Sequence, residues 1–216
     1  MKTTLLLIFV MFVMTSCDWL DFGKKSEDSS SIGGSTDISV NTVGNTFSPS
    51  VKIGGVAYPG NSSATITKID GGIATISIKS KLPANLAQII GASAKDASGN
   101  LNYDLKVKMT DEGILDYTNK NHDPFVLVKY DASVGDKYTL EKSDGVTITR
   151  EVISKSTTDD YYWSGMLIKT INVQQDSRIP GIKKFEFITN HKFGIVGIRI
   201  FMEDGTTSQI DLFSAK

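Results

Sequence analysis

Residues 101–109 read LNYDLKVKM, and this stretch, Leu101 to Met109, decides the fold. Its odd-numbered residues are all apolar, and its even-numbered residues are all polar or charged. Successive side chains of a β-strand point to opposite faces, so this strand is expected to bury one face and expose the other to water. Such alternation is typical of an antiparallel sheet with solvent on one side.

Similar runs occur on both sides of this strand. Upstream, Asp70-Gly71-Gly72 separates Ala64–Ile69 from 72–80, which predicts a hairpin because Asp-Gly supplies positive φ angles. Alternation also predicts strands around Ile38–Thr42 and Val51–Val56. Further strand-like runs are Phe125–Tyr130, Lys137–Lys142, Val146–Ser154, Gly165–Val173, Lys184–Thr189, Phe193–Met202 and Thr206–Phe213. The sequence therefore predicts a mainly β protein, an antiparallel meander forming a curved sheet or half-barrel, or else a sandwich.

One short helix is predicted at Pro83–Gly91, because Leu82, Leu86, Ile89 and Ile90 fall on one helical face. It is expected to cover a sheet face or a barrel end. The β-rich region is expected to span 37–216, and a subdivision near 111–133 leaves one or two β domains open.

The first seventeen residues have the order of a secretory signal peptide: Lys2, the apolar run Leu5–Met14, two small residues, and the lone cysteine Cys17. The apolar run has about ten residues, whereas a membrane-spanning helix needs about 20. Thr15 and Ser16 before Cys17 resemble the lipobox of bacterial lipoproteins, although Met14 stands where that pattern prefers Leu. The resemblance implies that Met1–Ser16 is removed and that Cys17 is acylated. The alternative is an ordinary secretory signal followed by an incidental cysteine.

The segments expected are thus a signal peptide and lipobox at 1–17 and a flexible tether at 18–36, rich in Ser and Gly. A lipid anchor at Cys17 implies the bacterial cell envelope, at the outer membrane, on its periplasmic or its surface side. The membrane would then be one partner of the protein.

Charge and residue counts exclude several functions. The chain has 23 basic and 24 acidic residues, which leaves no electrostatic footprint for nucleic acid. Its two histidines, His122 and His191, lack the spacing and the further ligands that a zinc site needs. No nucleophile or phosphate-loop motif is present. We therefore expect no metal, no cofactor and no enzymatic activity.

Three consecutive aromatic residues, Tyr161, Tyr162 and Trp163, follow Asp159-Asp160. Such a cluster can stack on a sugar ring or line an apolar mouth, so these three are the candidate ligand-binding residues. The alternative is a strand whose alternate aromatic side chains pack in the core, with Tyr162 at the surface.

The C-terminal part carries a resemblance, spread over Val134-Gly135-Asp136-Lys137-Tyr138, Arg150-Glu151-Val152, Lys184–Phe187, Phe193–Val196 and Asp204-Gly205. This part resembles Bacteroidetes lipoproteins of unknown function and, more loosely, the half-barrel domains of the LolA/LolB lipoprotein-carrier type. The resemblance covers roughly 134–216. It implies a curved sheet around an apolar concavity, and no shared catalytic residue.

Two functions remain in competition. The first is a non-enzymatic cell-envelope lipoprotein whose β-rich body binds a ligand or partner, with an apolar molecule as the candidate ligand. The second is a carbohydrate-binding accessory lipoprotein of a glycan-uptake system. An apolar ligand requires aromatic side chains inside a concavity, whereas a glycan requires several that are coplanar and exposed. Residues expected on a concave face are Leu167, Ile171, Phe185, Phe187, Phe193, Ile195 and Ile200; a closed sandwich, whose partner would be a protein, would bury the same set.

Overall fold

The computed structural model describes residues 28–59, 62–81, 87, 91–119, 121–142 and 145–215. Most of these residues belong to one large antiparallel sheet. Its strands are β1 (Thr46–Ile53), β2 (Val56–Ala57), β3 (Ser62–Asp70), β4 (Ile73–Ser80), β5 (Leu101–Met109), β6 (Gly113–Asp116), β7 (Phe125–Lys129), β8 (Lys137–Glu141), β9 (Thr147–Lys155), β12 (Ile171–Asp176), β13 (Ile182–Asn190), β14 (Gly194–Met202) and β15 (Thr207–Ser214). A separate two-stranded hairpin consists of β10 (Tyr161–Trp163) and β11 (Met166–Ile168).

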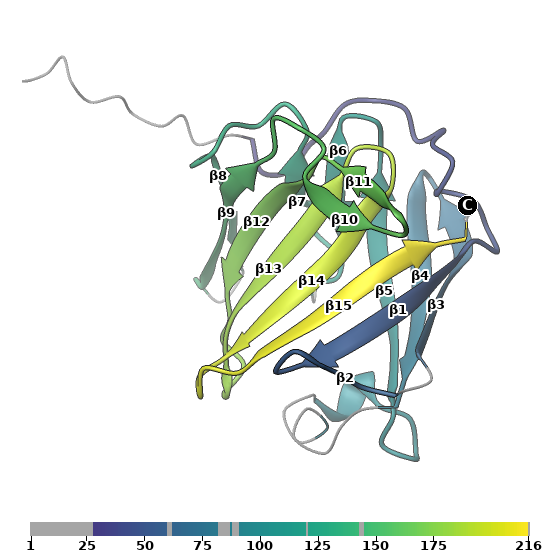
Figure 1. The fold of residues 1–216 in the computed structure, drawn as a ribbon. Coiled ribbons are helices and arrows are strands. Elements are labelled where there is room, and N and C mark those ends of the chain that lie inside the picture. Colours follow the sequence, from purple (N-terminus) through teal and green to yellow (C-terminus); the bar gives the residue numbers. More distant parts are fainter. Residues whose placement is uncertain are drawn as a thin grey trace, which may run out of the picture.

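The large sheet has 13 strands and curls into a nearly closed barrel (Figure 1). The strand order is β7-β6-β5-β4-β3-β1-β15-β14-β13-β12-β9-β8. The first and last strands of the chain pair along their length, from Phe47 with Ser214 to Ile53 with Ser208. This pairing joins the N-terminal and C-terminal halves of the barrel. The prediction of a mainly β antiparallel fold is confirmed, and its curved form is a barrel rather than two stacked sheets.

The backbone ladder ends at β7 on one side and at β8 on the other, and we call the line where these two strands meet the seam. They lie close together, since the backbone N–H of Lys129 in β7 donates to the Tyr138 hydroxyl of β8 at 3.3 Å. Strands β6 and β7, which lie within the predicted subdivision at 111–133, continue the same sheet.

The predicted hairpin at Asp70-Gly71-Gly72 is present between β3 and β4, and the predicted strand Leu101–Met109 is β5. Two predicted strands differ from the structure. Ile38–Thr42 forms turns, because the N–H of Asn41 donates to Ile38 O and its amide donates to Thr36 O. The run 165–173 is two strands, because the chain leaves strand geometry at Lys169 and Thr170: β11 belongs to the small hairpin and β12 to the large sheet. Ser164 and Gly165, with positive φ angles of 48° and 85°, make the tight turn between β10 and β11.

The predicted helix Pro83–Gly91 lies outside the described residues except for Ala87 and Gly91. Within the described residues, helical backbone occurs at Ala87 and in the short 3-10 turn η1 (Ala92–Ala94).

The end of the barrel that carries the β3–β4, β5–β6 and β13–β14 turns is covered by residues 35–45, and we call it the closed end (Figure 1). There the side chain of Val40 is fully buried and Ile38 packs against the main core. The N–H of Ser35 donates to the Asp111 carboxylate at 2.7 Å, and the N–H of Asp111 donates back to Ser35 O.

Residues 28–34 run along the seam before the chain reaches the closed end. Ser29 bridges the two edge strands, because its carbonyl accepts from Val126 N–H of β7 at 2.8 Å and its hydroxyl accepts from Thr139 N–H of β8 at 2.7 Å. Ile32 packs against the main core. The described part of the predicted tether, 28–36, therefore lies on the barrel.

The main core fills the closed end. Its fully buried side chains come from β3, β4, β5, β6, β7, β8, β9 and β12; they include Ile66, Ala74, Val107, Ile114, Val126, Val128, Tyr138, Val152 and Val173. At the opposite end, which we call the open end, several inward side chains of the same strands are only partly buried, among them Leu105, Leu140 and Ile148. The two ends of one barrel therefore differ in packing.

The close approach of β6 to β7 gives a test of the fold. A Cβ atom placed on Gly113 would lie 2.5 Å from the carbonyl oxygen of Val128 and 3.3 Å from Cα of Lys129. We expect Gly113→Ala to lower the free energy of unfolding by about 1–3 kcal/mol, since the backbone must shift. Urea denaturation measures the change.

Gly91→Ala is the matched control, because its added Cβ would meet nothing nearer than the Ser93 hydroxyl at 3.9 Å. Equal denaturation midpoints for the two variants would contradict this β6–β7 packing.

Candidate functional site

The open end of the barrel encloses a cavity of about 670 Å³. It extends inward as far as Met109 of β5 and Ile195 of β14. Most of its wall consists of inward-facing side chains of β1, β3, β4, β5, β9, β13, β14 and β15, and single residues come from β6, β7, β8 and β12. Most of these side chains are aliphatic or aromatic. Because the lining comes from alternate positions of many strands, the pattern that builds the barrel also builds the cavity.

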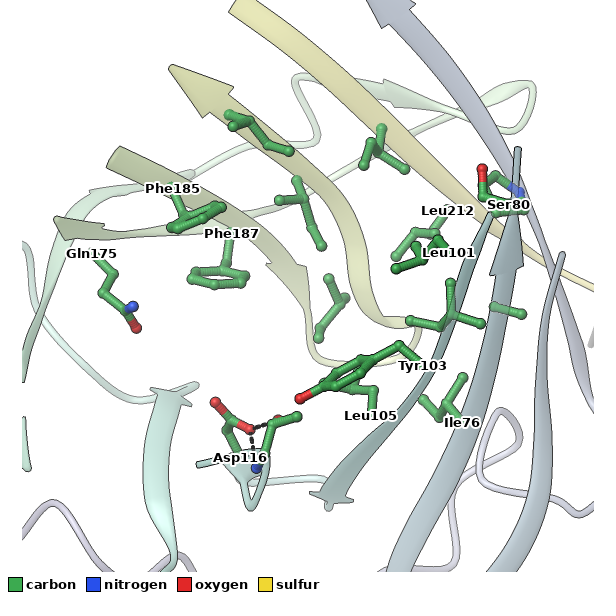
Figure 2. Close-up of a pocket in the computed structure, with 18 of the residues that line it drawn as sticks. Ile76, Ser80, Leu101, Tyr103, Leu105, Asp116, Gln175, Phe185, Phe187 and Leu212 are labelled. Carbon is green, nitrogen blue, oxygen red and sulfur yellow. Dashed lines mark hydrogen bonds between the residues drawn. The ribbon is translucent and has the colours of Figure 1, made fainter. Parts of the chain in front are cut away.

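Two strands illustrate how alternation sets this lining (Figure 2). In β13, Phe185 and Phe187 point into the cavity, with ring centroids 6.4 Å apart. Glu186 between them lies on the outer face, where its carboxylate accepts a hydrogen bond from Arg199 at 2.9 Å. In β5, Leu101, Tyr103 and Leu105 form the opposite wall, and the Tyr103 hydroxyl points toward Asp116 (Figure 2).

A buried ion pair interrupts the apolar lining. Arg150 of β9 is 4 % exposed, and its Nη2 donates to the Asp116 carboxylate of β6 at 2.6 Å. Its Nε donates to Oε1 of Gln175 in β12 at 2.8 Å. Burial lowers the pKa of Arg150 from its ordinary value, and the Asp116 carboxylate opposes that shift.

Arg150 also reaches β7 across the seam. Its Nη1 donates to the carbonyl oxygens of Phe125 and Val126 at 3.4 and 3.3 Å. Its guanidinium carbon lies 4.1 Å from the centroid of the Phe125 ring, a favourable cation–π contact. One side chain of β9 thus holds β6 and β7 from inside the barrel, where the backbone ladder is missing.

The predicted ligand-binding residues Tyr161, Tyr162 and Trp163 lie elsewhere. The hairpin β10–β11 rests against the outer face of the barrel (Figure 1). The Trp163 indole N–H donates to Leu212 O at 2.9 Å, and its ring lies 4.4 Å from that of Phe193. None of the three belongs to the cavity lining, so a ligand at this hairpin stays a prediction.

The other two aromatic side chains of this hairpin differ in exposure. The Tyr161 hydroxyl donates to Asp211 at 3.2 Å, and burial together with this carboxylate raises the pKa of Tyr161 to about 12. Tyr162 is 73 % exposed. The hairpin therefore has the alternate packing that the second interpretation of the aromatic cluster predicted.

The concave face predicted for the late strands is present in part. Phe185, Phe187, Ile195 and Ile200 line the cavity, as predicted from alternation. Three other predicted residues do not line it: Leu167 is exposed on β11, Phe193 packs against Trp163 outside the barrel, and Ile171 is buried in the main core. The early strands contribute as much lining as the late ones, which the sequence analysis did not anticipate.

Arg150 and Asp116 were not among the site residues predicted from the sequence. A signal for Arg150 was available, because Ile148, Arg150 and Val152 share one face of a predicted strand. A charged residue at the centre of an apolar face requires a partner of opposite charge.

The other positions considered from the sequence are Cys17, His122 and His191. Cys17 lies outside the described residues. His122 Nδ1 donates to Tyr117 O at 2.8 Å, whereas the ring of His191 lies edge-on to Tyr130. Within the described residues no group of three or more His, Cys, Asp or Glu could hold a metal ion. None of the described helical residues forms a helix long and apolar enough to span a bilayer.

Comparison with known proteins identifies no family. No family model matches the chain, and no curated protein matches it. One solved structure is similar, described as a "putative exported protein with YmcC-like fold" from Bacteroides fragilis NCTC 9343. The similarity has 11 % sequence identity and a TM-score of 0.47, and it covers 81 % of this chain and 97 % of that one. So distant a similarity assigns neither a family nor a function.

The buried ion pair gives the second test. Asp116→Asn keeps the size of the side chain but leaves the buried guanidinium of Arg150 without a counter-charge. We expect a loss of about 3–5 kcal/mol in the free energy of unfolding. Thermal or urea denaturation measures it.

Asp70→Asn serves as the control. Asp70 and Lys68 form an ion pair at 2.8 Å, and both of their side chains are exposed to solvent. Its loss should leave the midpoint nearly unchanged. If both variants unfold at the wild-type midpoint, Arg150 does not depend on Asp116.

Proposed function

We propose that this protein is a non-enzymatic binding protein of the bacterial cell envelope and that its barrel holds an apolar molecule. One observation carries the proposal, namely the cavity of about 670 Å³ at the open end, which apolar side chains line. Small-molecule sites typically have about 300–1,000 Å³ and a mostly apolar lining with a few polar groups. The Arg150–Asp116 pair, Gln175 and Tyr103 would be those polar groups here.

The burial of the lining supports a ligand site over a closed core. Val107 is 1 % exposed, whereas Leu105, two residues earlier on the same face of β5, is only partly buried. Phe187 and Ile195 are also partly buried, and Tyr103 is 36 % exposed. Covering such surface with an apolar ligand yields about 25 cal/mol per Å².

The orientation of the aromatic side chains favours an apolar ligand over a glycan. Phe47, Phe125, Phe185 and Phe187 all face the cavity, and a phenyl ring offers a sugar hydroxyl no hydrogen bond. At the hairpin β10–β11, Tyr162 is exposed but Trp163 is turned inward against the barrel. The hairpin therefore lacks a set of exposed, coplanar rings.

The location is also part of the proposal. The order of Lys2, Leu5–Met14 and Cys17 supports export and acylation, with the membrane as the site of attachment. Multiple acyl chains make a stable anchor where one chain does not. The described chain begins at Asp28 beside the seam, and the cavity opens at the end opposite to the one that residues 35–45 cover.

Filling the cavity tests the binding proposal. Nile red, a neutral apolar dye whose fluorescence rises in apolar surroundings, is the probe. Ile78 lines the cavity from β4, so Ile78→Trp should weaken dye binding by about tenfold or more, which corresponds to ~1.4 kcal/mol.

Lys79→Trp is the control, because Lys79 is exposed on the outer face of the same strand. Absence of dye binding by the wild-type protein, or equal loss in both variants, would refute a ligand in the cavity.

Anchoring is tested in cells. We expect the wild-type chain to incorporate a palmitate analogue and to fractionate with membranes, and Cys17→Ser to do neither. Continued labelling and membrane fractionation of Cys17→Ser would contradict acylation at Cys17.

A further inference from the structure

The charged side chains of the cavity lining fall into two groups. Asp116 and Arg150 neutralise each other inside the barrel at 2.6 Å. The other two are Lys81 and Lys142, and neither makes an ion pair with a residue that the structure describes. Among the described residues, the lining charge that has no ion-pair partner is therefore positive.

Both lysines lie at the mouth of the cavity. Lys81 follows the last residue of β4, and Lys142 follows the last residue of β8, and both strands end at the open end. Lys81 is exposed and Lys142 is partly buried, so each ammonium group remains hydrated. Neutral hydroxyl groups of Tyr58, Ser62 and Ser80 also face the cavity at this end.

We propose that the ligand is an anionic amphiphile, a long apolar chain with a carboxylate or phosphate head. The chain lies in the cavity, and the head lies at the mouth, near Lys81 and Lys142. This inference rests on the proposed function and names the chemical class of its ligand.

The interior offers a worse place for the anionic head. The Nε and Nη1 groups of Arg150 already donate to Gln175 and to two backbone carbonyl groups, and Nη2 donates to Asp116. A second carboxylate there would lose its hydration and would face the negative charge of Asp116. At the mouth the head keeps its water, and the two charged lining residues there, Lys81 and Lys142, are both positive, so the head points outward.

The experiment compares ligands that share one chain and differ in the head. Dodecanoate, dodecyl phosphate and the neutral dodecanol compete with Nile red for the wild-type protein and for Lys81→Met/Lys142→Met. A lysine near an anionic head contributes about fivefold in affinity at low salt, so the double variant should bind both anions about 25-fold more weakly. Its affinity for dodecanol should stay unchanged. Added salt should weaken anion binding by the wild-type protein.

Lys79→Met/Lys106→Met is the matched control, because it removes the same charge from the outer faces of β4 and β5. It should change anion binding far less than the double variant at the mouth. Comparison of the carboxylate with the phosphate decides which head is preferred.

Several outcomes would overturn the inference. Equal affinity of the wild-type protein for dodecanoate and dodecanol would mean that the site does not select charge. If Gln175→Leu loses anion binding and Lys81→Met/Lys142→Met keeps it, the anionic head lies inside the barrel. Both results leave Nile red binding intact, whereas failure of the proposed function abolishes it.

Discussion

The interaction on which this barrel depends is the one that Arg150 makes across the seam. The backbone ladder stops at β7 and β8, and exposed strand edges invite pairing with other chains. Arg150 joins β9 to Asp116 of β6 and to two carbonyl groups of β7. Burying this charge is favourable only because Asp116, Gln175 and the carbonyl groups together surround it. The barrel is thus closed by side chains where hydrogen-bonded strands would otherwise be required.

Closure by side chains also fixes the shape of the interior. Arg150 and Asp116 are both part of the cavity wall, so the pair that joins the two edges lies between the packed core and the cavity. Toward the closed end, Val107, Val128 and Val152 are fully buried. Toward the open end, the same strands present Leu105, Phe125 and Ile148 to the cavity. Stability and ligand binding can therefore reside at different ends of one sheet.

The sequence predicted the strands well, because alternation is a local property. Leu101–Met109 shows this, and its inward face is the one the pattern predicts. Alternation does not tell how far along the barrel axis a residue lies, so it could not separate buried Val107 from cavity-lining Leu105. The partner of Arg150 lies 34 residues away in β6, a strand of 4 residues that is too short for a periodic signal.

The aromatic cluster at Tyr161–Trp163 shows a second limit. Its alternate packing was foreseeable, since Trp163 and Tyr162 lie on opposite faces of β10. Its position was not, because the hairpin lies across the outside of the barrel, where Trp163 donates to the backbone of β15 and Tyr161 to the side chain of Asp211. A local pattern indicates which side chains are buried, and only the tertiary arrangement decides what buries them.

The hydrogen bonds of Ser29 to the two edge strands have a mechanical consequence. Ser29 hydrogen-bonds to both edges of the seam, and it lies between Cys17 and the rest of the barrel along the chain. If Cys17 is held in a membrane, any tension on the protein passes through residues 28–34 before it reaches a strand. In the part of the chain that the structure describes, the first bonds to a strand that bear this load are those of Ser29 to Val126 and Thr139. A pulling force would therefore peel this segment from the seam while the sheet, whose long β1–β15 pairing lies on the other side of the barrel, remains unloaded.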